Sequence, residues 1–136
     1  MKKHLATVLV LLGAGFVLWF GTGFVLGSQT MASGFGLPDW PTDQGTGFLV
    51  VKGIRDVALA LVLLALLLTG QRRALGWVML VTTTIPVGDM SLILARHGDT
   101  TTALTVHGLT ALVVLLTAVL LLTERRPVTT PARQRS

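Results

Sequence analysis

The sequence contains no cysteine and no tyrosine, and only 12% of its 136 residues are charged. Without cysteine the chain has no disulfide, thiol nucleophile or thiolate metal site. Soluble domains carry about 25% charged residues, whereas 51% of this chain is hydrophobic. The composition therefore predicts a membrane protein, in which a few spanning helices need no large water-excluding core.

Basic residues give the chain a net charge of +5, and most of them flank apolar runs. They form no stripe interleaved with aromatic residues, so a nucleic-acid partner is not expected. Basic clusters beside membrane spans are typical of cytoplasmic loops. The clustered residues are Lys2, Lys3, Arg72, Arg73, Arg125, Arg126, Arg133 and Arg135.

Four apolar runs of 21 or 22 residues are long enough to cross a bilayer. They cover residues 5–26, 48–69, 74–95 and 103–123. About 20 residues cross ~30 Å of hydrocarbon as a helix, and strand-like alternation is absent. We therefore expect an all-α fold, a four-transmembrane-helix bundle over residues 1–126, with the lipid bilayer as its surroundings.

The basic clusters predict the topology of this multi-pass protein in the cell membrane. They place both the N and C termini in the cytoplasm and residues 27–47 and 96–102 outside. The polar stretch 127–136 is expected to be a disordered basic tail. The first run also resembles a signal peptide, but its 22 apolar residues exceed the usual length of roughly 7–15, so a retained span is favoured over cleavage.

Three charged residues interrupt the second apolar run: Lys52, Arg55 and Asp56. A charge at the centre of a bilayer costs roughly 2.5 to 3.5 kcal/mol on insertion scales, so such groups usually face the inside of a bundle and mark a site. Lys52 and Asp56 can form an ion pair within the helix, and Arg55 is expected in the same sector. Gly53 permits the close approach of a neighbouring backbone.

The third and fourth runs contribute an acid and a histidine. Asp89 follows Pro86, which frees the carbonyl of Thr82 and predicts a kink beside the acid. Thr82, Asp89 and Arg96 are spaced by seven residues and form one polar stripe. His107 lies one turn into the fourth run.

Counted from the external helix ends, three ionisable groups lie at similar depth. Asp56, Asp89 and His107 are about 12, 9 and 6 Å deep at the helical rise, all in the outer half. Two interpretations remain open: a charge-compensated cluster that fixes helix packing, or a site in a cavity open to the outside. A metal site from these three groups is disfavoured by the adjacent cations, and no motif predicts a cofactor.

The external stretch 28–47 is rich in glycine and proline and cannot be one continuous helix. We expect it to fold over the outer mouth of the bundle, with Trp40 at the headgroup level. The alternative is an ordinary linker with an interfacial anchor.

Several short motifs together resemble an uncharacterised family of small four-helix integral membrane proteins, a domain-of-unknown-function family. The motifs are Gly36-Leu37-Pro38, Lys52-Gly53-Ile54-Arg55-Asp56, Pro86-Val87-Gly88-Asp89 and His107-Gly108. The resemblance covers nearly the whole chain, with Ala60 where the family often has glycine. It implies the four-span fold but no reaction, ligand or cofactor.

Three functions follow as hypotheses. The first is binding or conversion of a small hydrophobic ligand by acid/base chemistry. The second is a structural or accessory protein, which can also form a homo-oligomer, and whose buried charges only fix helix packing. The third is a proton-coupled transporter. The candidate catalytic residues are Asp89, His107 and Asp56, and the candidate ligand-binding residues are Lys52, Arg55, Thr82, Arg96 and Trp40.

Overall fold

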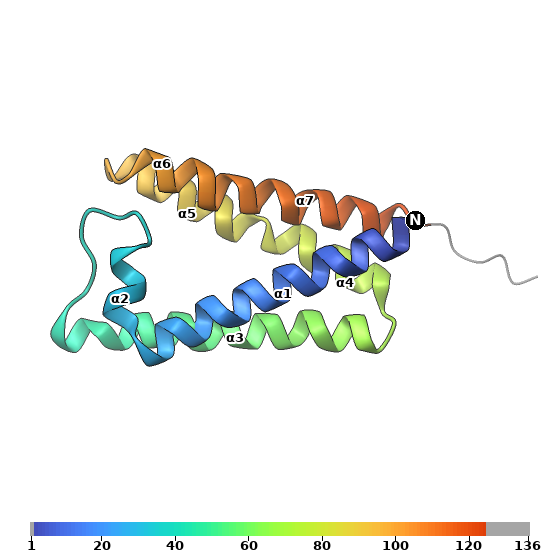
Figure 1. Ribbon diagram of the computed structural model, residues 1–136, viewed down its shortest axis with the longest axis horizontal. Helices are drawn as coiled ribbons and strands as arrows, with labels where there is room; N and C mark the ends of the chain where they lie inside the picture. Colours follow the sequence, from blue (N-terminus) through green and yellow to red (C-terminus); the bar gives the residue numbers. More distant parts are fainter. Residues whose placement is uncertain (1, 125–136) are drawn as a thin grey trace, which may run out of the picture.

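The computed structural model describes residues 2–124, which form helices and no strand. Four long helical segments run lengthwise, and a short helix lies near one end (Figure 1). The helices are α1 (Lys2–Leu26), α2 (Ser28–Ser33), α3 (Thr46–Leu68), α4 (Arg72–Thr82) continued by α5 (Thr84–Ala95), and α6 (Thr100–Thr102) continued through the π-helical segment η2 (Ala103–Gly108) into α7 (Leu109–Leu122). A 3₁₀ turn, η1 (Asp43–Gly45), precedes α3. The all-α prediction is confirmed; the predicted tail, 127–136, lies outside the described residues.

Within residues 2–124, three helices are long and apolar enough to cross a membrane: Lys2–Leu26, Arg72–Ala95 and Thr100–Leu122. α3 has a similar length, 23 residues, but it carries three charged residues, Lys52, Arg55 and Asp56. Large apolar side chains are exposed on all four long segments. Such an outer surface suits membrane insertion.

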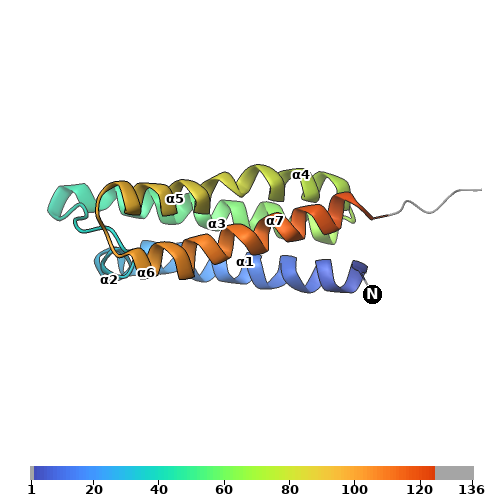
Figure 2. The same ribbon diagram turned by 90° about the horizontal axis from the view of Figure 1, so that it is seen from above.

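The long segments pack as two pairs, α1 with α3 and α4 with α7. The pairs are close together at the end that holds Lys2 and Glu124 and diverge toward the other end (Figure 1). Viewed from above, α7 runs obliquely, so its C-terminal part lies beside α4 (Figure 2). α1 crosses α3 at Gly21 and Gly53, where a methyl group added to Gly53 would lie 2.6 Å from the Gly21 carbonyl oxygen. The predicted close approach at Gly53 is therefore present.

An ionic clamp joins three segments at the end that holds the termini; we call it the terminal clamp. The Arg72 guanidinium donates from Nε and NH2 to the two carboxylate oxygens of Glu124, at 2.6 Å each. It also donates to Thr7 Oγ1 at 3.0 Å and to the carbonyl of Lys3 at 3.1 Å. The hydrogen bond from Arg72 holds the pKa of Glu124 below its usual range.

At the opposite end, residues 27–45 fold over the diverging helices; we call this segment the cap. It contains α2 and η1 and is not a continuous helix, as predicted. Phe35 of the cap is buried against Ile93 and Ala103. The Gly36 carbonyl accepts a hydrogen bond from the Asp99 backbone N–H at 2.8 Å, so the cap is attached to the loop between α5 and α6.

The third and fourth segments are both locally irregular. The third breaks at Thr83, between α4 and α5, where Pro86 lacks the N–H that the Thr82 carbonyl would accept. The predicted irregularity before Asp89 is therefore present. The fourth begins at Asp99, whose side chain accepts from the Thr102 backbone N–H at 2.8 Å. Hydrogen bonds from the Thr102 hydroxyl and backbone lower the pKa of Asp99.

Candidate functional site

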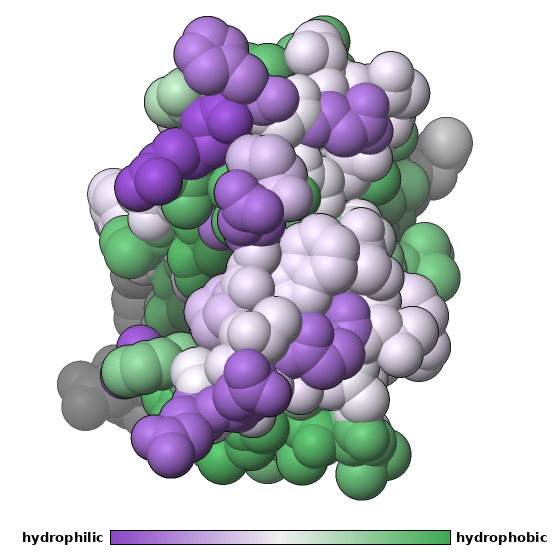
Figure 3. Space-filling model, turned by 90° about the vertical axis from the view of Figure 1, so that its left-hand side faces the viewer, coloured by the Kyte–Doolittle hydropathy of each residue, from purple (hydrophilic) through white to green (hydrophobic). Residues whose placement is uncertain are grey.

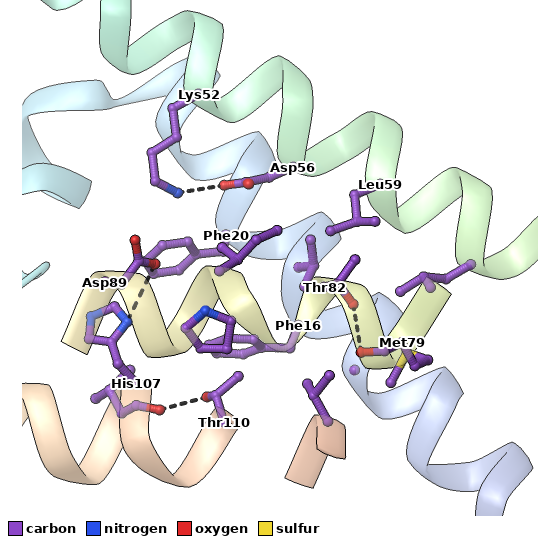
Figure 4. Close-up of a pocket in the computed structure, with 17 residues that line it drawn as sticks. Phe16, Phe20, Lys52, Asp56, Leu59, Met79, Thr82, Asp89, His107 and Thr110 are labelled. Carbon is purple, nitrogen blue, oxygen red and sulfur yellow. Dashed lines mark hydrogen bonds and ion pairs between the residues drawn. The ribbon is translucent and has the colours of Figure 1, made fainter. Parts of the chain in front are cut away.

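A cavity of about 110 Å³ lies between the two helix pairs and receives side chains from all four long segments (Figure 4). Its polar lining residues are Lys52, Asp56, Thr82, Asp89, His107 and Thr110. Its apolar lining residues are Gly13, Phe16, Val17, Phe20, Leu59, Leu63, Met79, Ile85, Pro86, Val106 and Val114. On α3 the lining extends from Lys52 to Leu63, about 16 Å at the helical rise. The cavity is therefore elongated along the helices, with its charged groups near the cap.

Lys52 lies among aromatic rings and beside a carboxylate. Its Nζ donates to Asp56 Oδ2 at 2.7 Å. The same ammonium lies 4.7 Å from the ring centroid of Phe24, 5.2 Å from that of Phe20 and 5.5 Å from that of Phe35. Cation–π attraction acts within about 6 Å of a ring centroid, so each ring contributes. These contacts balance the charge of Lys52 inside the bundle.

His107 is buried, with 5% of its surface exposed, and is held by the cap. Its Nε2 lies 3.1 Å from the Phe35 carbonyl oxygen, and its ring centroid lies 4.7 Å from that of Phe35. A carbonyl oxygen can only accept, so Nε2 carries a proton. The other ring nitrogen, Nδ1, lies 3.7 Å from Asp89 Oδ2. His107 therefore presents one nitrogen to the acid in the cavity.

Asp89 is held less closely than the other charged groups. The 3.7 Å separation from His107 Nδ1 is too long for a hydrogen bond. Among residues 2–124 no side chain or backbone N–H donates a hydrogen bond to its carboxylate. Its side chain is 27% exposed and lines the cavity. The carboxylate of Asp89 is therefore available to a bound molecule.

The hydroxyl groups of the cavity bond to their own helices. Thr82 Oγ1 donates to the Met79 carbonyl at 3.1 Å, and Thr110 Oγ1 donates to the Val106 carbonyl at 2.6 Å. Each hydroxyl oxygen keeps acceptor capacity toward the cavity. Within residues 2–124 no three His, Asp or Glu side chains converge as metal ligands would.

The family described as "Domain of unknown function (DUF4267)" matches residues 13–121. The chain belongs to this family. The predicted resemblance to an uncharacterised family is thus confirmed. No curated protein and no solved structure matches the chain. All residues that line the cavity, from Gly13 to Val114, lie within the DUF4267 match, whereas the Lys3, Thr7 and Glu124 groups of the terminal clamp lie outside it.

Three of the predicted ligand-binding residues of this DUF4267 protein do not line the cavity: Arg55, Arg96 and Trp40. Arg55 is exposed. Viewed along the helix axis, it lies about 60° to one side of Lys52, whereas Asp56 lies about 40° to the other side. The expectation that Arg55 shares the sector of Lys52 and Asp56 is wrong. Arg96 is exposed beyond the end of α5.

Trp40 belongs to the cap rather than to the cavity. Its Nε1 donates to Gln29 Oε1 at 2.9 Å, and Gln29 Nε2 donates to the Pro41 carbonyl at 2.8 Å. Trp40 also packs beside the buried cluster that contains Phe35. It therefore stabilises the cap and has no contact with the cavity.

The aromatic groups and the π-helical segment were not among the predicted features. Phe16, Phe20 and Phe24 recur every four residues on α1, which is the spacing of one helix face, so two of the three rings near Lys52 were detectable. Phe35 was not, because it lies in an irregular segment. The π-helical segment, which ends at His107 and Gly108, has no sequence signal, although such segments are frequent at functional sites.

Proposed function

We propose that this DUF4267 protein crosses the cell membrane with four helices and keeps both termini in the cytoplasm. Three segments are apolar enough by composition. In α3, Lys52 and Asp56 face the cavity and are paired, which lowers the cost of placing α3 in lipid. The terminal residues Lys2 and Lys3 lie at the same end as Arg72, and basic residues favour the cytoplasmic side.

We further propose that the protein binds a small hydrophobic molecule in the cavity between the helix pairs. The observation that carries this proposal is the shape and chemistry of the cavity, which has a long apolar body and charged groups near one end. Ligand sites are typically apolar with a few converging polar groups. Intramembrane ionisable groups are functional more often than structural.

Asp89 and His107 supply the acid/base part of the proposal. Nε2 of His107 is occupied by the Phe35 carbonyl, so Nδ1 is the nitrogen that can gain or lose a proton. Nδ1 and the Asp89 carboxylate lie 3.7 Å apart, and a polar group of a bound molecule can approach both. This arrangement suits proton exchange with that molecule.

The test of binding uses two glycines of the same helix. Gly13 lines the cavity and Gly15 does not, and a Cβ added at either position meets nothing within 4 Å. Gly13→Leu therefore fills cavity space, whereas Gly15→Leu adds the same side chain to the outer surface. After purification in a mild detergent, mass spectrometry of the extracted lipids should find a molecule with the wild type and with Gly15→Leu but not with Gly13→Leu. Equal extracts from all three proteins would contradict the proposal.

A structural role is the second candidate, and the Lys52–Asp56 pair favours it. The two side chains are paired at 2.7 Å and enclosed by aromatic rings, as expected of a charge-compensated packing element. On this view Lys52→Met with Asp56→Leu is tolerated better than either change alone. Asp89→Asn and His107→Gln separate the two views. A purely structural cluster predicts that neither substitution changes the copurified molecule, whereas the binding proposal predicts that the molecule is lost.

Transport is the least supported of the three functions. Toward the end that holds the termini the cavity meets an apolar cluster that includes Val10, Leu63, Leu75 and Met79. A polar path through the protein would have to cross this cluster. The cavity therefore has the form of a pocket rather than a channel.

A further inference from the structure

We infer that the cavity takes a single-chain amphiphile with an uncharged, hydroxyl-bearing head, and that this molecule enters sideways from the bilayer between α3 and α5. The inference rests on the proposed binding function and names its ligand class and access route. Three observations carry it: the charge balance at the polar end, the narrow cavity and the separation of α3 from α5.

The charged groups near the cap form two pairs. Lys52 is paired with Asp56, and His107 faces Asp89. An anionic head would meet Asp89, which has no hydrogen-bond donor of its own within residues 2–124, and a cationic head would meet Lys52. Like charges in a medium of low dielectric constant repel strongly. A hydroxyl group avoids both repulsions, because it can donate to Asp89 and accept from a remaining N–H of Lys52.

The cavity is too small for two chains. Its volume is about 110 Å³, while an engineered cavity of about 150 Å³ holds one benzene molecule. The apolar walls from Phe16 and Leu59 to Val114 extend away from the charged groups. A short stretch of one alkyl chain is therefore the largest apolar group that this volume accepts, and a two-chain phospholipid does not fit.

Access from the aqueous side is covered by the cap. The Phe35 carbonyl and ring contact His107, and the Gly36 carbonyl is bonded to Asp99. Phe35 is itself buried and lies over Lys52. A molecule arriving from water would have to break these contacts.

Access from the side is open between α3 and α5. α3 packs against α4, near the turn that joins them, and has no comparable packing against α5. Ile85 of α5 lines the cavity and is 45% exposed. The view onto the cap shows a hollow with hydrophobic residues at its left, between the upper part, with α5, and the lower part, with α3 (Figure 3). In a bilayer this opening faces lipid chains.

The head-group test uses three photoreactive probes with the same diazirine-bearing alkyl chain. One ends in an alcohol, one in a carboxylate and one in a trimethylammonium group. The full-length protein in nanodiscs is irradiated with each probe, and labelled peptides are mapped. We expect the alcohol probe to label Leu59, Met79 or Val114 at least about tenfold more than the charged probes, a difference of about 1.4 kcal/mol. Equal or greater cavity labelling by a charged probe overturns the inference while leaving the binding proposal intact; no cavity labelling by any probe contradicts both.

The access route is tested with three tryptophan variants and the rate of labelling by the alcohol probe. Ile85→Trp narrows the opening between α3 and α5. Ile54→Trp adds the same bulk to α3 at a side chain that is 56% exposed and does not line the cavity. Val106→Trp narrows the side between α1 and η2. We expect labelling to slow by at least about tenfold in Ile85→Trp and to stay at the wild-type rate in Ile54→Trp.

Folding of each tryptophan variant is checked by circular dichroism and gel filtration. Unchanged labelling in a folded Ile85→Trp, or slowing only in Val106→Trp, overturns the access route. If Ile85→Trp fails to fold, Ile85→Phe replaces it, with Ile54→Phe as its control, and the same outcomes apply.

Discussion

Two clusters of charged side chains lie toward opposite ends of this molecule, and their groups are satisfied to different degrees. In the terminal clamp, Arg72 makes two hydrogen bonds of 2.6 Å to Glu124 and further bonds to Thr7 and Lys3. In the cavity, Lys52 pairs with Asp56 on its own helix, and Asp89 lies 3.7 Å from His107 without a hydrogen bond. The terminal clamp joins separate segments, whereas the cavity groups retain unused bonding capacity.

This difference shows which charges hold the fold and which can serve a ligand. A fully bonded group that connects α1, α4 and Glu124, two residues beyond α7, contributes to helix association. A carboxylate without a donor contributes little to stability and is available for binding. Burial alone does not separate the two roles, since the side chains of Arg72 and Asp89 are similarly exposed, at 24% and 27%.

The largest expected effect breaks the terminal clamp. Arg72→Met removes the guanidinium and leaves Glu124, whose side chain is only 9% exposed, without its partner. We expect the free energy of unfolding to fall by about 2–3 kcal/mol, less than for a fully buried pair, because the Arg72 side chain is 24% exposed. Unfolding with sodium dodecyl sulfate in mixed micelles, followed by tryptophan fluorescence, measures the change. The double variant Arg72→Met with Glu124→Leu should lose less than Arg72→Met alone, and an equal loss would show that the two groups are not coupled.

The next effect tests whether close helix packing, rather than charge, holds α3 beside α1 near the cavity. Gly53→Ala would place a methyl group 2.6 Å from the Gly21 carbonyl oxygen, and we expect a loss of about 1–3 kcal/mol from overpacking. Gly47→Ala is the matched control on α3, because a Cβ there meets nothing within 4 Å. The same unfolding assay applies. An equal loss of stability in both variants would show that the close contact at Gly53 does not hold α3 beside α1.

A smaller stability effect is expected inside the cavity. Asp89→Asn removes a carboxylate that accepts no hydrogen bond from the described residues, so stability should change by less than about 1 kcal/mol. Labelling by the alcohol probe should nevertheless fall by at least about tenfold. Lys52→Met is the contrasting variant, because it leaves Asp56 unpaired and should destabilise the protein more. A large loss of stability in Asp89→Asn would show that Asp89, like the groups of the terminal clamp, holds the fold.

The smallest expected effect is a pH dependence of the terminal clamp. The hydrogen bond from Arg72 keeps the pKa of Glu124 below its usual value of 4.5, so folding stabilises the ionised form. This contribution to stability is fully present when the pH is above the pKa of Glu124 in the unfolded protein. It is lost as the pH falls through the lower pKa of Glu124 in the folded protein. Between about pH 5 and about pH 3 the wild type should lose up to about 1 kcal/mol that Glu124→Gln does not lose. Parallel thermal melts of the two proteins across this pH range measure the difference. The same change of melting temperature with pH in both proteins would exclude a contribution from Glu124.

Helix positions could be predicted because they depend on local sequence. Runs of about 20 apolar residues specify helices in lipid, and α1, α3, α4–α5 and α6–α7 fall within a few residues of the predicted runs. The break before Asp89 was predictable for the same reason, because Pro86 acts on its own turn. The shared depth of Asp56, Asp89 and His107 also follows from the helical rise.

The contacts between segments could not be predicted in this way. Arg55 was expected beside Asp56, but the way α3 rotates against α1 places Lys52 in the cavity and Arg55 on the outer surface. That rotation depends on which glycines meet, here Gly21 and Gly53. A sequence of small residues permits several such contacts and selects none of them.

The long apolar helices and the charged residues that interrupt them follow from local sequence, because backbone hydrogen bonding and hydropathy act over neighbouring residues. Other features depend on how the helices pack: Phe35 of the cap holds His107, Lys52 lies among three phenylalanine rings, and Asp89 faces the cavity without a hydrogen-bond donor among the described residues. These relations join residues far apart in the chain. They arise when helix pairs diverge and an irregular segment covers the space between them.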